Sequence, residues 1–291
     1  MTADIHQLQC LEVWGGNDES SRGVRMYGLD AWLLSRPSGG DASGGDIHYV
    51  SSCSSGMITR MLLADVAGHG TTVSDVALRL RTLMRRNVQR RDQDVLIGAI
   101  NAEFAAISDD GRFATALIAT HWAPTGEVDV TLAGHPPPMI RRGGGAWTAL
   151  EPEVSAPHAA PGNIPLGVID TATYRSTRVR LGDGDTALFY TDGIVEARSP
   201  QGEMLGYDGL ARLLASEPLE PAETFVERLY ARVQAFAGRA EPEDDSTLLL
   251  VRRNRASLTR GLAARVLRTP LNWVREKLER PGLPRASARP A

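Results

Sequence analysis

Strand-like and helix-like segments in this sequence come in groups of the same kind, and this grouping is the strongest constraint on the fold. Residues 46–52 and the apolar run that ends at Asp65 form one strand-like pair, and residues 113–122 and 128–135 form another. Short connections within each pair are typical of antiparallel hairpins. The chain does not show the strict strand–helix alternation of a doubly wound parallel sheet. We therefore expect an α+β sandwich of antiparallel sheets.

Two amphipathic segments separate these pairs. Residues 71–91 place apolar side chains at steps of three and four, with arginines on the opposite face, which predicts a helix. A second helix is expected at residues 92–107. The remaining elements expected are strands at residues 25–35, 173–181, 186–193 and 246–253, helices at 207–216 and 222–237, and an irregular Gly-, Ala- and Pro-rich excursion at 143–162.

Length and charge divide the chain into a body and a tail. With 291 residues, 42% of them hydrophobic, the chain can bury a sizeable core, and we assign one domain to residues 8–254. The formal net charge is −3, which gives no reason to expect nucleic-acid binding. Residues 252–291 carry eleven Arg or Lys against two Glu, a balance of about +9 that leaves roughly −12 on the body.

The basic tail, residues 255–291, is partly amphipathic, and two interpretations of it are possible. A basic amphipathic element can lie on an anionic membrane or dock on a partner. It can also pack back on the acidic body as a surface helix, or stay poorly ordered. The sequence leaves these alternatives, and homodimerisation, open.

Cysteine usage and hydropathy bear on the compartment. Cys10 and Cys53 belong to no CxxC or Cys/His spacing, so neither a disulfide framework nor a thiolate zinc site is expected. No stretch approaches the roughly 18 to 20 apolar residues of a membrane helix, and the first residues lack a signal-peptide pattern. We therefore expect a cytoplasmic protein.

Acidic residues stand where strand-like segments meet glycine or another acid. Hard cations such as Mg²⁺ and Mn²⁺ prefer oxygen ligands and keep several waters, so carboxylates without His or Cys suit them better than zinc. Two such ions, about 3.5 to 4 Å apart, can activate a water for in-line attack on a phosphoryl group. The acids in this pattern are Asp46, Asp65, Asp192, Asp244 and Asp245.

Six short motifs occur in a fixed order, and four of them contain these acids. They are Gly44-Gly45-Asp46; Asp65-Val66-Ala67-Gly68-His69-Gly70; Phe113-Ala114-Thr115 with Ala133-Gly134-His135-Pro136-Pro137; Pro165-Leu166-Gly167; Thr191-Asp192-Gly193-Ile194-Val195-Glu196; and Asp244-Asp245-Ser246-Thr247. Over residues 44–252 the set resembles the SpoIIE/RsbU-type branch of the metal-dependent (PPM) phosphatases, which are related to eukaryotic type 2C protein phosphatases. The resemblance implies an αββα sandwich, two antiparallel sheets flanked by helices.

The resemblance also implies a role for each acid. Asp65 corresponds to the bridging ligand of two Mn²⁺ or Mg²⁺ ions, and the carbonyl of Val66 to a ligand of the second ion. Asp192 and Asp244 correspond to ligands of the first ion, and Asp46 completes the second, directly or through water. Asp245 is the alternative ligand if the register of the last motif is shifted by one residue.

Two histidines accompany these motifs. His69 is a candidate proton donor to the leaving hydroxyl, and equally a helix-entry residue packed between glycines. His135 is expected to be structural and to fix a loop near the site. Asp65 and Asp192 are, with His69, the residues expected to carry catalysis.

One departure from the family pattern concerns the residues after Gly44-Gly45-Asp46. The family commonly has an aromatic pair and another aspartate there, whereas this chain has Ile47, His48 and Tyr49. A third metal or substrate contact at that edge is therefore not supported, and no single arginine stands out as a phosphate ligand.

The expected activity is hydrolysis of phosphoserine or phosphothreonine on a protein, with an anti-sigma-factor antagonist as the substrate type that the resemblance suggests. A catalytically silent protein that binds a phosphoprotein is the alternative, which a missing metal aspartate would favour. A nucleotide cyclase of the GGD type is disfavoured, because the acidic and aromatic residues that should follow Gly44-Gly45-Asp46 are missing.

Overall fold

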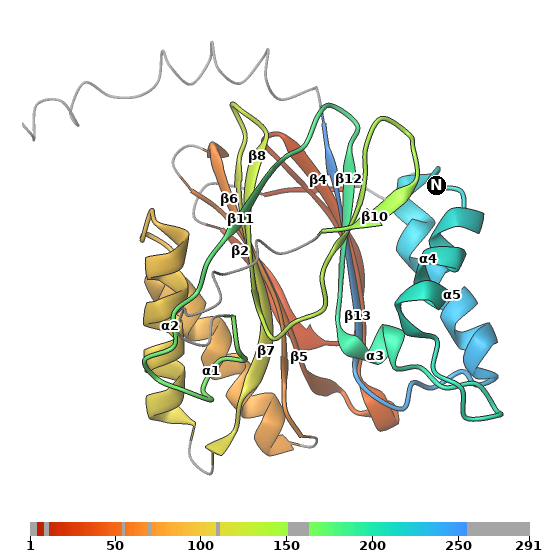
Figure 1. Ribbon diagram of the computed structural model, residues 1–291, viewed down its shortest axis with the longest axis horizontal. Helices are drawn as coiled ribbons and strands as arrows, with labels where there is room; N and C mark the ends of the chain where they lie inside the picture. Colours follow the sequence, from red (N-terminus) through yellow and green to blue (C-terminus); the bar gives the residue numbers. More distant parts are fainter. Residues whose placement is uncertain are drawn as a thin grey trace, which may run out of the picture.

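Two β-sheets face each other, and each carries helices on its outer side (Figure 1). The computed structural model describes residues 5–8, 12–53, 56–68, 71–108, 111–150 and 163–254. Residues 255–291, which form the predicted basic tail, lie outside the described residues, as do most of the irregular excursion and His69.

Within the described residues, the first sheet has seven strands and the second has six. All neighbouring strands of both sheets are antiparallel except β1 and β3, which pair in parallel. In spatial order, the first sheet consists of β1 (His6–Gln7), β3 (Ser20–Met26), β4 (Leu29–Arg36), β13 (Ser246–Arg253), β12 (Thr186–Tyr190), β9 (Met139–Arg141) and β10 (Trp147–Ala149). The second consists of β11 (Thr177–Arg180), β8 (Glu127–Ala133), β7 (Ala114–Trp122), β6 (Ile58–Val66), β5 (Ser43–Cys53) and β2 (Val13–Asp18).

Helices cover both outer faces, so the order of layers is αββα, as predicted (Figure 1). The predicted spacing of residues 71–91 is confirmed, because Val76, Leu80 and Leu83 are buried against the second sheet. Asp92 caps the following helix by accepting a 3.1 Å hydrogen bond from the Val95 amide. The second sheet carries α1 (Thr71–Asn87) and α2 (Gln93–Ile107), and the first carries α4 (Gly206–Ser216) and α5 (Phe225–Ala237), with short helices η1 (Ser38–Gly40), α3 (Asp192–Val195) and η4 (Ala222–Thr224).

The structure differs from the sequence-based expectation at residues 25–35, which were expected to form one strand. They belong to two antiparallel strands, β3 and β4, joined at Tyr27 and Gly28. Gly28 has φ +83, a left-handed conformation that a glycine adopts without steric cost, so the chain reverses there. The short helix α3 and the strands β1, β2, β9 and β10 were also not predicted, and β10 lies within residues 143–162, which were expected to be irregular.

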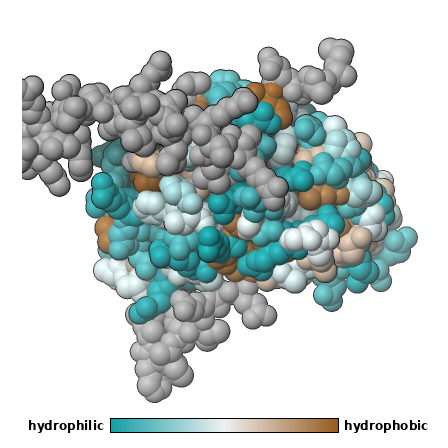
Figure 2. All heavy atoms as spheres, turned by 90° about the horizontal axis from the view of Figure 1, so that it is seen from above, coloured by the Kyte–Doolittle hydropathy of each residue, from teal (hydrophilic) through white to brown (hydrophobic). Residues whose placement is uncertain are grey.

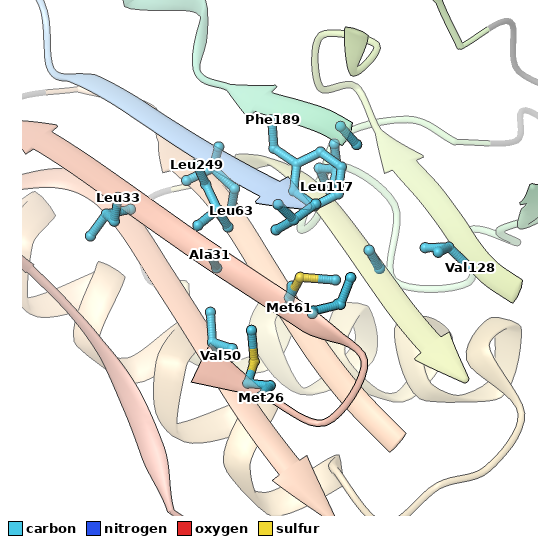
Figure 3. Packing of buried hydrophobic residues seen from close by; sticks show 14 of the residues in the cluster. Met26, Ala31, Leu33, Val50, Met61, Leu63, Leu117, Val128, Phe189 and Leu249 are labelled. Atoms are coloured by element: carbon cyan, nitrogen blue, oxygen red, sulfur yellow. The ribbon is translucent and has the colours of Figure 1, made fainter. Parts of the chain in front are cut away.

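The space between the sheets is filled by apolar side chains from both (Figure 3). Strand alternation sends every second residue inward, so Met61 and Leu63 of β6 meet Leu33 of β4 and Leu249 of β13 in one cluster. This core fixes how the two sheets lie relative to one another. The core therefore holds residues at the ends of facing strands close to one another at one end of the sandwich.

The face shown in Figure 2 is mainly hydrophilic, with apolar residues scattered among polar ones, which is usual for a protein surface in water. None of the described helices combines the length and the apolar character that crossing a membrane requires.

Candidate metal centre

Two of the predicted acids face each other across neighbouring strands. In the pairing of β5 with β6, Asp46 lies directly opposite Asp65. Alternation places both on the inner side of the second sheet, the side on which Val50 and Leu63 pack against the first sheet. Like charges in directly opposed positions destabilise a strand pair. A cation between the two carboxylates would remove that repulsion.

The first sheet brings two more acids to the same end of the sandwich. Asp192 comes two residues after the end of β12 and opens α3, which lies at that end in Figure 1, and Asp244 comes two residues before β13. Gly68, Gly193 and Asp244 border one cavity, so these motifs meet at that end, and the charges of Asp192 and Asp244 act on Asp65. Glu196, one turn after Asp192, adds a further charge that acts on both Asp65 and Asp192.

Hydroxyl groups from the first sheet hold one oxygen of Asp46. Thr191 and Thr247 both donate to Asp46 Oδ2, over 2.8 and 2.7 Å. The Thr247 amide donates in turn to Thr191 Oγ1 at 2.9 Å, so the two threonines form one unit. Asp46 Oδ1 is buried and has no hydrogen-bond partner among the described residues. A buried carboxylate oxygen without a donor is a site for a cation, because desolvation without compensation is costly.

Electrostatics of the cluster favour the uptake of positive charge. Burial, followed by the charge of Asp65, raises the pKa of Asp46 well above its ordinary value. Burial, followed by the charges of Asp192 and Asp244, raises the pKa of Asp65 to about 7. Burial and then Glu196 raise the pKa of Asp192. Each shift reflects carboxylates that are desolvated next to one another, and bound divalent cations would reverse it.

Asp245 has a different environment from its neighbour Asp244. The amide of Ser38 donates to Asp245 Oδ1 at 2.7 Å, and the amides of Gly45 and Asp46 donate to Oδ2. Both oxygens are therefore engaged by backbone donors, one from the segment before β5 and two from the first residues of β5. A side chain on Gly44 could not fit, since its Cβ would lie 2.3 Å from Asp245 Oδ2. This contact explains the glycines beside the acid.

The remaining candidate ligand is the carbonyl of Val66. Its oxygen is 3.0 Å from the position that a Cβ on Gly45 would occupy, so it lies close to the start of β5. In the part of the chain that the structure describes, no three His, Cys, Asp or Glu side chains converge tightly enough to hold one ion by themselves. A backbone carbonyl and waters would complete the shell, which agrees with the waters that Mg²⁺ keeps. The donor set thus fits hard divalent cations.

Of the two histidines, His69 lies outside the described residues. His135 is buried, and its Nδ1 forms a 2.9 Å hydrogen bond with Thr115 Oγ1. Thr115 is the residue of β7 that pairs with Asp65. Burial lowers the pKa of His135 to about 3, so the ring is neutral at pH 7. These contacts agree with the expectation that His135 fixes a loop near the site.

Thr191, Thr247 and Glu196 are the residues of the site to which sequence reasoning gave no role. Each lies inside a motif that was recognised for its aspartate, so their proximity in sequence was a usable signal. Their function depends on a contact between the two sheets, which the local pattern does not contain.

Comparison with known proteins agrees with this architecture. The family model "Stage II sporulation protein E (SpoIIE)" matches residues 55–254. The RsbU and RsbW domains of a Mycobacterium tuberculosis protein are similar to this chain with a TM-score of 0.64 and 21% identity, covering 90% of this chain and 70% of that one.

Two further solved structures share the fold. The SiaA-PP2C domain of Pseudomonas aeruginosa has a TM-score of 0.65 and 20% identity, covering 77% of this chain and 86% of that one. The PP2C phosphatase domain of SpoIIE from Bacillus subtilis, solved with a fragment of its regulatory domain, has a TM-score of 0.63 and 17% identity, covering 84% and 64%.

The layers of the sandwich are those of the PP2C-like phosphatase fold. Since the family model spans well over half of the sequence, the chain belongs to the SpoIIE family. The predicted resemblance is confirmed. Asp46 precedes the matched residues, and its place in the site rests on the contacts described above.

Proposed function

We propose that this chain is a metal-dependent phosphatase that hydrolyses phosphoserine or phosphothreonine on a protein, with two Mn²⁺ or Mg²⁺ ions. The observation that carries the proposal is Asp46: two hydroxyls hold its Oδ2, while its buried Oδ1 has no partner among the described residues. When bound, the ions would supply an activated water and neutralise charge on the phosphoryl group.

The chain's own residues would divide the work as follows. Asp65 would serve both ions; its position opposite Asp46 and the charges of Asp192 and Asp244 that act on it support this role. Asp192 and Asp244 would hold the first ion, and Asp46 with the Val66 carbonyl the second. Asp245 would keep the chain before β5 in place rather than bind metal, because three backbone amides already engage its two oxygens.

The substrate and setting are part of the same proposal. The similarity to an RsbU domain solved together with an RsbW domain supports a regulatory phosphoprotein of the anti-sigma-factor antagonist type as substrate. We place the enzyme in the cytoplasm and its catalytic domain at residues 8–254, followed by the basic tail at 255–291.

The test is Mn²⁺-dependent phosphate release from p-nitrophenyl phosphate and from a phosphothreonine peptide. Asp192→Ala should reduce turnover at saturating peptide by at least about 100-fold, because loss of outer-shell partners alone typically costs 10- to 100-fold. Glu223→Gln is the matched control, since it removes one exposed charge from η4.

The alternative is a silent phosphoprotein-binding protein. A folded wild type that binds phosphopeptide but releases no phosphate at any Mn²⁺ or Mg²⁺ concentration would favour this alternative and contradict the enzyme. All the expected metal aspartates are present, which supports turnover.

A further inference from the structure

A cavity of about 700 Å³ begins at the acidic end of the sandwich and extends along helix α5. Gly68, Gly193 and Asp244 border it at the candidate metal centre. Its far part is bordered by Gln234 and Ala237 of α5. A phosphoryl group at the metal centre would therefore have this groove beside it. We refer to the whole cavity as the α5 groove.

Charge in the α5 groove is predominantly negative. Its ionisable lining comprises five carboxylates and two guanidinium groups. Arg239 already forms an ion pair with Glu243, and Arg198 donates to the carbonyl of Gly202 at 3.1 Å. Asp244 belongs to the metal centre. The carboxylates that remain to meet a ligand are Asp41, Glu196 and Glu241.

The wall formed by α5 is partly apolar. Tyr230, Val233 and Ala237, spaced three and four residues apart, lie on the side of the helix that borders the groove. Pro242 lines the loop that follows. A segment that fits the groove should thus offer an apolar contact to α5 and positive charge to the acids. A flat, purely acidic surface would not require the apolar contact.

We propose that the α5 groove receives the polypeptide next to the phosphorylated residue and selects substrates with Arg or Lys in that flank. The inference rests on the proposed phosphatase function and adds a substrate class to it. Continuity of the groove with the metal centre supports a substrate segment as the occupant. The negative lining supports a basic one, since opposite charges raise the rate and specificity of association.

The experiment compares two phosphothreonine peptides that differ only in flanking Arg or flanking Glu. For the full chain, kcat/KM should be about fivefold higher with Arg for each flanking charge that pairs, as an exposed pair contributes up to about 1 kcal/mol. The preference should shrink as salt is raised from 0.05 to 0.5 M, because the added ions screen exposed charges. Each value is divided by the p-nitrophenyl phosphate rate of the same protein.

Glu241→Lys, after α5, and Asp41→Lys, after η1, test the location of the binding site. Both side chains are exposed, so the variants should fold. Each should reduce or reverse the Arg preference, whereas Glu223→Lys, before the start of α5, should leave the preference as in the wild type. Equal kcat/KM for the two peptides in wild type, or an unchanged preference in both groove variants, would overturn the proposal.

Binding is measured separately, so that the groove is tested even without turnover. Fluorescein-labelled peptides with a non-hydrolysable phosphonate are titrated, and their anisotropy should show the same Arg preference and the same loss in Glu241→Lys. Failure of p-nitrophenyl phosphate hydrolysis would contradict the proposed function alone. Absence of an Arg preference in the binding measurement would contradict the groove alone.

The basic tail is the competing occupant, because it also carries positive charge. In the full chain, Arg265, Arg268 and Arg275 are replaced together by Gln. If the tail occupies the groove, this variant should bind both peptides more tightly and turn both over faster, and that result would overturn the substrate proposal. Unchanged peptide preferences in the tail variant support it.

Discussion

The space between the two sheets holds two kinds of buried ionisable group, and these differ in their surroundings. At one end lie Asp46 and Asp65, and deeper in the sandwich lie His48 and His121. His48 is two residues from Asp46 on β5, and His121 is on the inner side of β7. Burial raises the pKa of Asp65 to about 7 and lowers the pKa of each histidine to about 3. In both places, the low dielectric favours the neutral form.

What separates the two places is access to a compensating charge. The aspartates lie close to Asp244, whose charge acts on Asp65 and which borders the α5 groove. Both ring nitrogens of His48 and of His121 are buried and have no hydrogen-bond partner among the described residues. The same physical cost would favour the uptake of a cation at the open end, whereas it is a fixed destabilisation in the closed interior.

Removing one charge from the acidic end should produce the largest effect and separate stability from activity. Asp65→Asn relieves repulsion from Asp192 and Asp244. Without metal, the free energy of unfolding of this variant should therefore be about 1 to 2 kcal/mol higher than that of the wild type. Mn²⁺-dependent turnover should fall at least about 100-fold. Denaturant unfolding in EDTA and phosphate release are the measurements.

Glu223→Gln is the control for the Asp65 variant. It should change neither the free energy of unfolding without metal nor the Mn²⁺-dependent turnover. A metal-free Asp65→Asn protein that is less stable than wild type would show that the carboxylates do not repel one another as the geometry requires.

Removing the hydroxyls that hold Asp46 should weaken the metal site without removing a ligand. Thr191→Val and Thr247→Val each delete one donor to Asp46 Oδ2. Each should raise the Mn²⁺ concentration for half-maximal activity by about 10- to 100-fold. Thr191→Ser and Thr247→Ser keep the hydroxyl and should restore most of the affinity. Equal Mn²⁺ dependence in the Val and Ser variants would rule out this role.

The buried imidazoles should make the protein sensitive to acid. Their folded pKa of about 3 lies below the ordinary value of 6.5. The unfolded chain therefore binds more protons between these values, and stability is lost as the pH falls from about 6.5 toward 3. Each histidine contributes a slope of up to about 1.4 kcal/mol per pH unit.

Replacing the buried imidazoles tests this slope. His48→Leu and His121→Leu should each flatten the dependence of unfolding free energy on pH between 6.5 and 4.5, measured with denaturant. His6→Gln, at an exposed position, is the control. An unchanged slope in both Leu variants would mean that the rings take up protons in the folded state.

The parts of the structure that could be predicted from the sequence are those with a local signature. The hairpin that ends at Asp65 follows from two strand-like runs, and helix α1 follows from its apolar spacing. The turn at Gly28 was missed, because a single glycine in an apolar run does not show by itself that the strand ends. The parallel pairing of β1 rests on contacts with a distant strand.

The site shows the same limit. Motif order indicated which acids belong together, but the direct pairing of Asp46 with Asp65 depends on the register between β5 and β6. The difference between Asp244 and Asp245 depends on which of them meets the amides of Ser38 and Gly45. Adjacent identical residues give no sequence signal for that choice.

The hydrogen bonds from Thr191 and Thr247 to Asp46 join one sheet to the other at the point where chemistry is proposed to occur. Neither sheet alone contains the site, so a chain in which only one half has folded has nothing with which to bind the ions. Because of the same bonds, the geometry of the proposed site depends on how the two sheets are positioned relative to one another. A regulator that displaced one sheet along the other by an ångström would change metal affinity without touching a single ligand.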